Sequence, residues 1–158
     1  MIITVASTKG GPGKTTLTLC LADHWHRTGK TVEVLDVDPN RNLSQWLKGA
    51  KSPIPWTVVD EDDLVDAASE AEQRSEVVVI DVAGALARGL VYAIGVASAV
   101  LIPARPDQKD AIEAARTYQH VTTAERQAQR YKPNIMIPAA AVLMQVNKRT
   151  QAAGFARE

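Results

Sequence analysis

Short apolar runs rich in β-branched residues alternate with longer segments of helical periodicity, and this alternation constrains the fold more than any other feature of the chain. These runs predict strands over 2–7, 31–37, 54–59, 76–81, 99–104 and 139–146. The spacing of apolar residues between them predicts helices over 14–28, 61–73, 85–97 and 107–130. Near-continuous apolar strands are typical of a parallel sheet covered on both faces. We therefore expect a doubly wound α/β fold, with a mostly parallel sheet and helices on both faces.

Length and composition favour one domain over residues 1–158. A chain of 158 residues, 46% of them hydrophobic, is long enough for one core, and no linker, repeat or low-complexity stretch divides it. It contains no run of about 18 apolar residues, and no basic segment precedes the first predicted strand. We therefore expect a cytoplasmic protein with no membrane partner. The single cysteine, Cys20, excludes a cysteine-ligated cluster within one chain, and we expect it to be a small buried residue on a helix. We expect Trp25, Trp46 and Trp56 to be packing residues of the core.

A glycine-rich stretch, STKGGPGKTT at 7–16, lies between the first predicted strand and the first predicted helix. Its glycines let the backbone curl around an anion with N–H groups turned inward, and the helix N-terminus adds a positive dipole end. We expect Lys14 to reach the β- and γ-phosphates of a nucleotide and the hydroxyl of Thr15 to ligate Mg²⁺. Pro12 has no N–H to donate and should stiffen the turn. The predicted cradle consists of Gly10, Gly11, Pro12, Gly13, Lys14, Thr15 and Thr16.

Carboxylates end two other predicted strands. Asp36 and Asp38 end the second strand on one side of an extended segment, and Asp81 ends the fourth after four apolar residues. Ligands of such sheets bind at the carboxyl ends of the strands. Two carboxylates would repel a nearby triphosphate unless Mg²⁺ lies between the carboxylates and the phosphates, or unless one carboxylate acts on a water. Asp81 has the form of a Walker B residue that holds a magnesium-bound water, and Gly84 is placed to bring a backbone N–H to the γ-phosphate and sense its presence.

The loop departs from the common pattern G-x-x-x-x-G-K-[ST], because Thr8 stands in place of the first glycine and Lys9 follows it. With this second lysine the stretch resembles the deviant Walker A ATPases of the ParA/MinD family. Their loop, K-G-G-x-G-K-[ST], is matched from Lys9 to Thr15, and Thr16 completes its common form. The resemblance also covers DVDPN after the second strand, the strand that ends in Asp81, and ASAVLIPARPDQKD, which is similar to a family segment through Pro103, Pro106 and Asp110.

The resemblance implies a role for each matched position. Lys9 would be the signature lysine, which reaches the nucleotide of a second subunit in a face-to-face homodimer with ATP in the interface. Such a cation neutralises phosphate charge only when two subunits meet, as an arginine finger does. Asp38 would position or activate the attacking water, and Asn147 would face the adenine. The implied catalytic residues are Lys9, Lys14 and Asp38, and those implied for Mg²⁺ are Thr15, Asp36 and Asp81.

Two features depart from the family. Many relatives read Asp-x-Pro-Pro after the fourth strand, whereas this chain reads Asp81-Val-Ala-Gly84. Relatives also usually continue through a further strand and helix beyond the position of Glu158, and that region often helps to bind adenine and nonspecific DNA.

Charge is unevenly distributed along the chain. Residues 1–103 hold nine Lys/Arg against 13 Asp/Glu, and residues 104–158 hold nine against five. The basic end suits an anionic partner such as DNA, or is an ordinary solvated face. It includes Arg126, Arg130, Lys132, Lys148, Arg149 and Arg157.

The function that the resemblance implies is that of a ParA-like ATPase in plasmid or chromosome partitioning. ATP would drive dimerisation, the dimer would bind DNA nonspecifically, and a ParB-like partner would stimulate slow hydrolysis. A MinD-like positioning ATPase is one alternative, but the segment RTQAAGFARE has little apolar surface for an amphipathic anchor. Another is a metabolic ligase or kinase on the same scaffold, similar to dethiobiotin synthetase, which would turn over without DNA or a partner.

Overall fold

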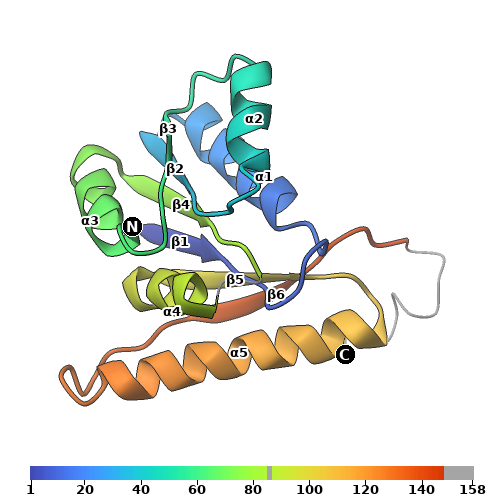
Figure 1. The fold of residues 1–158 in the computed structure, drawn as a ribbon, viewed down its shortest axis with the longest axis vertical. Helices are drawn as coiled ribbons and strands as arrows, with labels where there is room; N and C mark the ends of the chain where they lie inside the picture. Colours follow the sequence, from blue (N-terminus) through green and yellow to red (C-terminus); the bar gives the residue numbers. More distant parts are fainter. Residues whose placement is uncertain (85–86, 148–158) are drawn as a thin grey trace.

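The computed structural model describes residues 1–84 and 87–147, and within them the chain forms one six-stranded sheet (Figure 1). The strand order is β3-β2-β4-β1-β5-β6, and every neighbouring pair is parallel. The parallel sheet expected from the sequence is thereby confirmed. The strands are β1 (Ile2–Val5), β2 (Val32–Asp36), β3 (Trp56–Val58), β4 (Val77–Asp81), β5 (Ala99–Ala104) and β6 (Ala139–Leu143).

Helices cover both faces of the sheet, as predicted (Figure 1). On one face α1 and α2 pack through apolar side chains such as Leu17 and Leu43. On the other face α3, α4 and α5 contribute Leu64, Leu90 and Val121 to a separate cluster. Burial on both sides explains why the central strands are almost entirely apolar. The helices are α1 (Lys14–Arg27), α2 (Asn42–Gly49), α3 (Leu64–Arg74), α4 (Ala87–Val96) and α5 (Gln108–Ala128).

The helix α2 was absent from the prediction. It has only eight residues, and it begins at the last residue of the segment DPNRN, whose composition is typical of a turn. Its signal was the pair Leu43 and Leu47, which are four residues apart and fully or almost fully buried. Strands β3 and β6 are also shorter than predicted, and α3 begins at Leu64 because residues 61–63 form a turn.

Two side chains expected in the core lie on the surface instead. Cys20 is exposed on α1, and Trp46 on α2 is 57% exposed. Both helices turn only part of their circumference toward the sheet, and these residues fall outside that apolar stripe. No helix within the described residues combines the length and the apolar character needed to cross a membrane.

Strand register brings the predicted site residues to one edge of the sheet. Asp36 of β2 lies opposite Asp81 of β4, and Val5 at the end of β1 lies opposite Asp81 on its other side. The loop that follows β1 therefore begins beside Asp81, with Asp36 one strand further along the sheet. This edge is the carboxyl end of the strands, where ligands of doubly wound folds bind.

Candidate functional site

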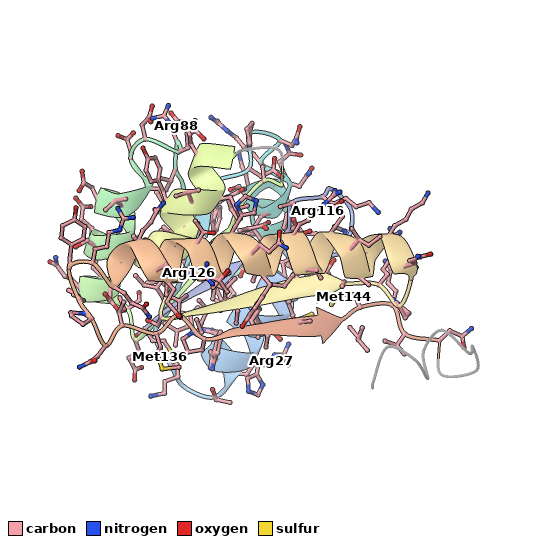
Figure 2. All side chains as sticks on the ribbon, turned by 90° about the horizontal axis from the view of Figure 1, so that it is seen from below. Arg27, Arg88, Arg116, Arg126, Met136 and Met144 are labelled. Atoms are coloured by element: carbon pink, nitrogen blue, oxygen red, sulfur yellow. The ribbon has the colours of Figure 1, made fainter. Side chains whose placement is uncertain are left out.

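The loop after β1 turns into α1 through glycines in left-handed conformations. Gly11 has φ 87° and Gly13 has φ 102°, values that L-amino acids with side chains rarely adopt. Gly13 is the N-cap of α1 and supplies no side-chain acceptor, so the N–H groups of the first turn remain able to bind an anion. A Cβ added at Gly13 would also meet the side chain of Met144 at 3.1 Å. Met144 follows β6 and is labelled in Figure 2.

Lys14 extends from the first turn of α1 into a largely buried position. Its Nζ donates to the carbonyl oxygen of Lys9 at 3.0 Å. Burial lowers the pKa of Lys14 from its ordinary value, and the nearby carboxylates of Asp81 and Asp38 oppose that shift. The loop backbone therefore orients the ammonium group, and the charges of the two carboxylates favour its protonated form, which a cation that contacts phosphate requires.

Asp81 and Thr15 are joined across the edge of the sheet. The hydroxyl of Thr15 donates to Oδ2 of Asp81 at 2.7 Å. Asp81 is 1% exposed, and its Oδ1 has no hydrogen-bond partner within the described residues. The pKa of Asp81 is raised to about 6, and burial is the largest cause. The charges of Asp36 and Asp38 also raise it, while the hydrogen bond from Thr15 and the charge of Lys14 lower it. A buried carboxylate oxygen without a partner, next to a threonine hydroxyl, is a suitable position for a hard divalent cation.

Thr15 and Asp81 suit Mg²⁺, which needs few protein ligands, better than a metal whose ligands all come from the protein. No group of three or more His, Cys, Asp or Glu side chains able to hold a metal occurs in the described ranges. Mg²⁺ typically takes one or two protein oxygens and completes its shell with water and substrate phosphates. Thr15 and Asp81 would supply the protein oxygens.

Asp36 lies beneath the site rather than in it. Its side chain is fully buried, and its oxygens accept hydrogen bonds from the backbone N–H and hydroxyl of Ser44 and from the N–H of Asp38. Those contacts, 2.9, 2.6 and 3.2 Å long, fix the turn from β2 into α2. The implied role of Asp36 toward Mg²⁺ stays a prediction, and the contacts in the structure give it a role in shaping the turn.

A cleft of about 450 Å³ opens over the loop, a volume within the range of ligand sites. It is lined by eight of the predicted site residues, namely Gly10, Gly11, Gly13, Lys14, Thr15, Thr16, Asp38 and Gly84. Four further lining residues, Asn40, Asn42, Ala83 and Gln145, were not predicted. Asn40 belongs to the DVDPN segment, whose likeness to the family was the signal for it, and its backbone and side-chain nitrogens each donate to Oδ1 of Asp38 at 2.9 Å.

Several predicted residues lie outside the lining of this cleft. Pro12 is buried in the loop, and Asn147 is exposed beyond β6. Asp81 is beneath the cleft, where its Oδ2 meets Thr15. The predicted adenine contact of Asn147 therefore stays a prediction.

Gly84 allows the loop after β4 to pack directly on the loop after β1. A Cβ at this position would lie 2.6 Å from the carbonyl oxygen of Ser7 and 2.8 Å from that of Lys9. The absence of a side chain is thus required by packing, whereas its predicted contact with a γ-phosphate stays a prediction. This packing places the two loops in direct contact at the mouth of the cleft.

Lys9 points away from its own cleft and toward α5. Its Nζ donates to Oδ1 of Asp110 at 2.8 Å, and Asp110 is 2% exposed. Hydrogen bonds from Arg105, together with that from Lys9 and against the effect of burial, hold the pKa of Asp110 well below its usual range. The side chain of Lys9 is about one third exposed and reaches the surface at this point. The sequence matched both residues to one family but gave no sign that they pair.

A family model described as the CobQ/CobB/MinD/ParA nucleotide binding domain matches residues 3–154. Among curated proteins, the ParA protein of Rhizobium radiobacter is 35% identical over 127 residues, which make up 78% of this chain and 57% of that protein. The chain thus spans little more than half the length of this curated relative.

Two solved structures share the fold at low sequence identity. Cobyrinic acid a,c-diamide synthase from Mycobacterium smegmatis, with bound ADP and magnesium, superposes with a TM-score of 0.78 at 17% identity, over 99% of this chain and 78% of that one. A putative plasmid partition protein of Borrelia burgdorferi bound to AMPPNP gives a TM-score of 0.71 at 16% identity, over 98% and 79% of the two chains.

Proposed function

The chain belongs to the CobQ/CobB/MinD/ParA family of nucleotide-binding domains, and from this premise we propose that it is a ParA-like ATPase that binds Mg-ATP, dimerises and takes part in DNA partitioning. We take residues 1–158 as one ATPase domain that acts in the cytoplasm. The curated ParA relative, 35% identical, supports partitioning over the other activities of the family. The observation that carries the proposal is the divergence of the two loop lysines, with Lys14 at the cleft and Lys9 outside it.

Nucleotide binding rests on the cleft and on the groups at its floor. The glycines at 10, 11 and 13 leave backbone N–H groups for phosphate oxygens, and Lys14 adds a cation at the N-terminus of α1. Thr15 and Asp81 would hold Mg²⁺, which neutralises charge on the β- and γ-phosphates when bound. The structures with bound ADP or AMPPNP that share the fold support nucleotide binding by this chain.

Hydrolysis would use Asp38 and, from a second subunit, Lys9. Asp38 lines the cleft, and two hydrogen bonds from Asn40 fix its Oδ1, so the carboxylate is oriented to accept a proton from, or position, a water. Lys9 does not line the cleft of its own subunit, which suits a cation that serves a neighbour. We expect hydrolysis to be slow until a partner protein of the ParB type stabilises the productive arrangement.

A nonspecific DNA contact would involve the basic end of α5 and the segment after it. Arg126, Arg130 and Lys132 are exposed there, and Figure 2 shows α5 crossing one face of the molecule with Arg116 and Arg126 labelled. Positive side chains grouped at the end of a helix and just after it would attract the phosphate backbone without reading sequence. The other basic residues named from the sequence, Lys148, Arg149 and Arg157, lie outside the described residues.

The decisive experiment compares the mass of Asp38→Ala with and without Mg-ATP, by size-exclusion chromatography with light scattering. Blocking hydrolysis should trap the nucleotide-bound state, so the expected result is a monomer that becomes a dimer only with ATP. Binding of the trapped dimer to random-sequence DNA, absent with ADP, would extend the result to partitioning. A variant that binds ATP yet stays monomeric would contradict the proposal and favour a metabolic enzyme of the same family.

A further inference from the structure

Thr8, which replaces the first glycine of the common phosphate-loop pattern, is held by α5. Its hydroxyl donates to Oε2 of Glu113 at 2.8 Å. Its backbone N–H donates to the hydroxyl oxygen of Thr117 at 3.1 Å. These partners are 105 and 109 residues away in sequence. A glycine at this position would keep only the backbone contact, so the side chain of Thr8 adds a specific link between the loop and the helix.

The hydrogen bonds of this anchor are mutually consistent. The hydroxyl of Thr117 donates its one hydrogen to the carbonyl oxygen of Glu113 at 2.8 Å, which leaves a lone pair for the N–H of Thr8. The hydroxyl of Thr8 is then free to donate to the carboxylate of Glu113. Thr117 is fully buried, so a lost hydrogen bond there would leave a polar group without water. We call Thr8, Glu113 and Thr117 the loop anchor.

The loop anchor continues the contact that holds Lys9. Asp110, Glu113 and Thr117 are spaced by three and four residues and therefore lie on one face of α5. Asp110 receives the ammonium group of Lys9, while the other two receive Thr8. Two successive loop residues are thus fastened to the first three turns of one helix.

Thr8 lies between two residues whose carbonyl oxygens face Gly84 and Lys14, which line the cleft. Its neighbour Ser7 presents a carbonyl oxygen to Gly84, and its other neighbour Lys9 presents one to Gly84 and to the ammonium group of Lys14. A shift of the backbone at Thr8 would move these carbonyl oxygens and the origin of the Lys9 side chain together. Misplacement of a catalytic group by about 1 Å can lower a rate by about a hundredfold.

We propose that Glu113 and Thr117 are positioning residues, which fix Thr8 and thereby set the direction in which the Lys9 side chain leaves the loop. Neither residue is among those that line the cleft, and both would act through Thr8. The inference rests on the proposed function, because it assigns Lys9 to hydrolysis. It also explains a feature that the phosphate-binding pattern leaves open, namely why a threonine precedes the signature lysine.

The test uses isosteric changes that replace a hydroxyl with a methyl group. For Thr8→Val and Thr117→Val we expect the turnover number for Mg-ATP to fall about tenfold to a hundredfold, with the ATP dissociation constant within about threefold of wild type. Thr8→Ser should restore turnover, because it keeps the donor to Glu113. Thr123→Val is the matched control: its hydroxyl makes the same type of contact within α5, to the carbonyl oxygen of Gln119 at 2.8 Å, but no contact with the loop. It should behave as wild type.

A second readout needs no nucleotide. Amide hydrogen exchange by NMR should show faster exchange of the Thr8 N–H in Thr117→Val than in Thr123→Val, because its acceptor is gone. Normal turnover in Thr8→Val, or turnover in Thr8→Ser as low as in Thr8→Val, would overturn the proposed positioning. A weaker ATP affinity with unchanged turnover would also overturn it. A wild-type chain that does not hydrolyse ATP would instead refute the proposed function, even if the Thr8 exchange behaved as expected.

Discussion

Lys14 donates from its ammonium group to the backbone carbonyl oxygen of Lys9, at 3.0 Å, so the two lysines of the loop are in direct contact although their side chains point to different places. Lys14 occupies the cleft, whereas the side chain of Lys9 ends at Asp110 on α5. One loop therefore directs one ammonium group into the cleft and the other out of it, to Asp110. The proposed function gives the two lysines separate roles on this basis.

Substitution of the two lysines should separate binding from hydrolysis. We expect Lys14→Ala to reduce ATP affinity by at least about a hundredfold, because a charge-assisted contact with phosphate and a buried cation are both lost. Lys9→Ala should keep ATP affinity within about threefold and lose hydrolysis. Isothermal titration calorimetry and a phosphate-release assay on the same preparations measure the two quantities. Normal hydrolysis by Lys9→Ala would show that this lysine has no catalytic role.

Removal of the Asp81 charge should raise the free energy of unfolding at neutral pH, and it should also remove one of the groups proposed to hold Mg²⁺. Because the folded-state pKa of about 6 lies above the ordinary 3.8, the native state holds a proton more tightly than the unfolded chain. Stability therefore falls as the pH rises between these values, and above pH 6 the whole cost of the buried charge is present. Asp81→Asn should be more stable than wild type at pH 7, by at most about 3 kcal/mol, and equal to it below about pH 4.

Urea denaturation in Mg²⁺-free buffer at pH 7 and pH 4 checks this expectation. Asp66→Asn, a change at an exposed residue of α3, is the control and should alter stability by less than about 0.5 kcal/mol. A less stable Asp81→Asn at pH 7 would mean that the buried carboxylate is better compensated than its contacts indicate.

The parts of the molecule that follow from local sequence were predicted well. Apolar runs revealed the strands predicted at 2–7, 76–81 and 99–104, and the sheet contains all three, with β1 ending two residues earlier than predicted. The phosphate cradle was also predictable, because glycine conformation, helix start and lysine all lie within ten consecutive residues. Helix α2 was missed because it is short and follows turn-forming residues, so that the spacing of Leu43 and Leu47 was too weak a signal of helical periodicity.

Contacts between distant segments could not be predicted. Lys9 and Asp110 are 101 residues apart, and nothing in periodicity or composition indicates that the first turn of α5 faces the loop after β1. That pairing depends on β5 lying beside β1 in the sheet, and strand order is not encoded locally. For the same reason the contacts of Asp36 could not be predicted: the resemblance implied a role toward Mg²⁺, and Ser44, which donates to Oδ2 of Asp36, belongs to the helix that was missed.

The ion pair of Asp110 should contribute stability that is lost in acid. Its folded-state pKa lies below the ordinary value near 3.9, so the contribution is fully present above that value and disappears as the pH falls below it. Asp110→Asn should lower the free energy of unfolding by about 1–3 kcal/mol at pH 7, since Lys9 and Arg105 lose a charged acceptor. The difference from wild type should narrow as the pH approaches 3.

Asp23→Asn provides a matched control for that change. Asp23 pairs with Arg27 at 2.7 Å on the exposed surface of α1, where an ion pair is worth less than about 1 kcal/mol. Urea denaturation of both variants at pH 7 and pH 3 compares a buried acceptor with an exposed one. An equal effect of the two substitutions at pH 7 would contradict the stabilising role of the Asp110 cluster.

Gly84→Ala should disturb the site through contact rather than through backbone strain. The φ of Gly84 is not in the left-handed region, but its new methyl group would lie 2.6 Å from the carbonyl oxygen of Ser7 and 2.8 Å from that of Lys9. Neither backbone oxygen can withdraw as a flexible side chain would, so we expect a loss of about 1–3 kcal/mol in unfolding free energy and weaker ATP binding. Gly95→Ala in α4 is the control, since its methyl group meets nothing within 4 Å and should stabilise the helix by about 0.5–1 kcal/mol. Thermal and urea denaturation with ATP titration measure both effects, and wild-type stability in Gly84→Ala would show that the two loops are free to separate.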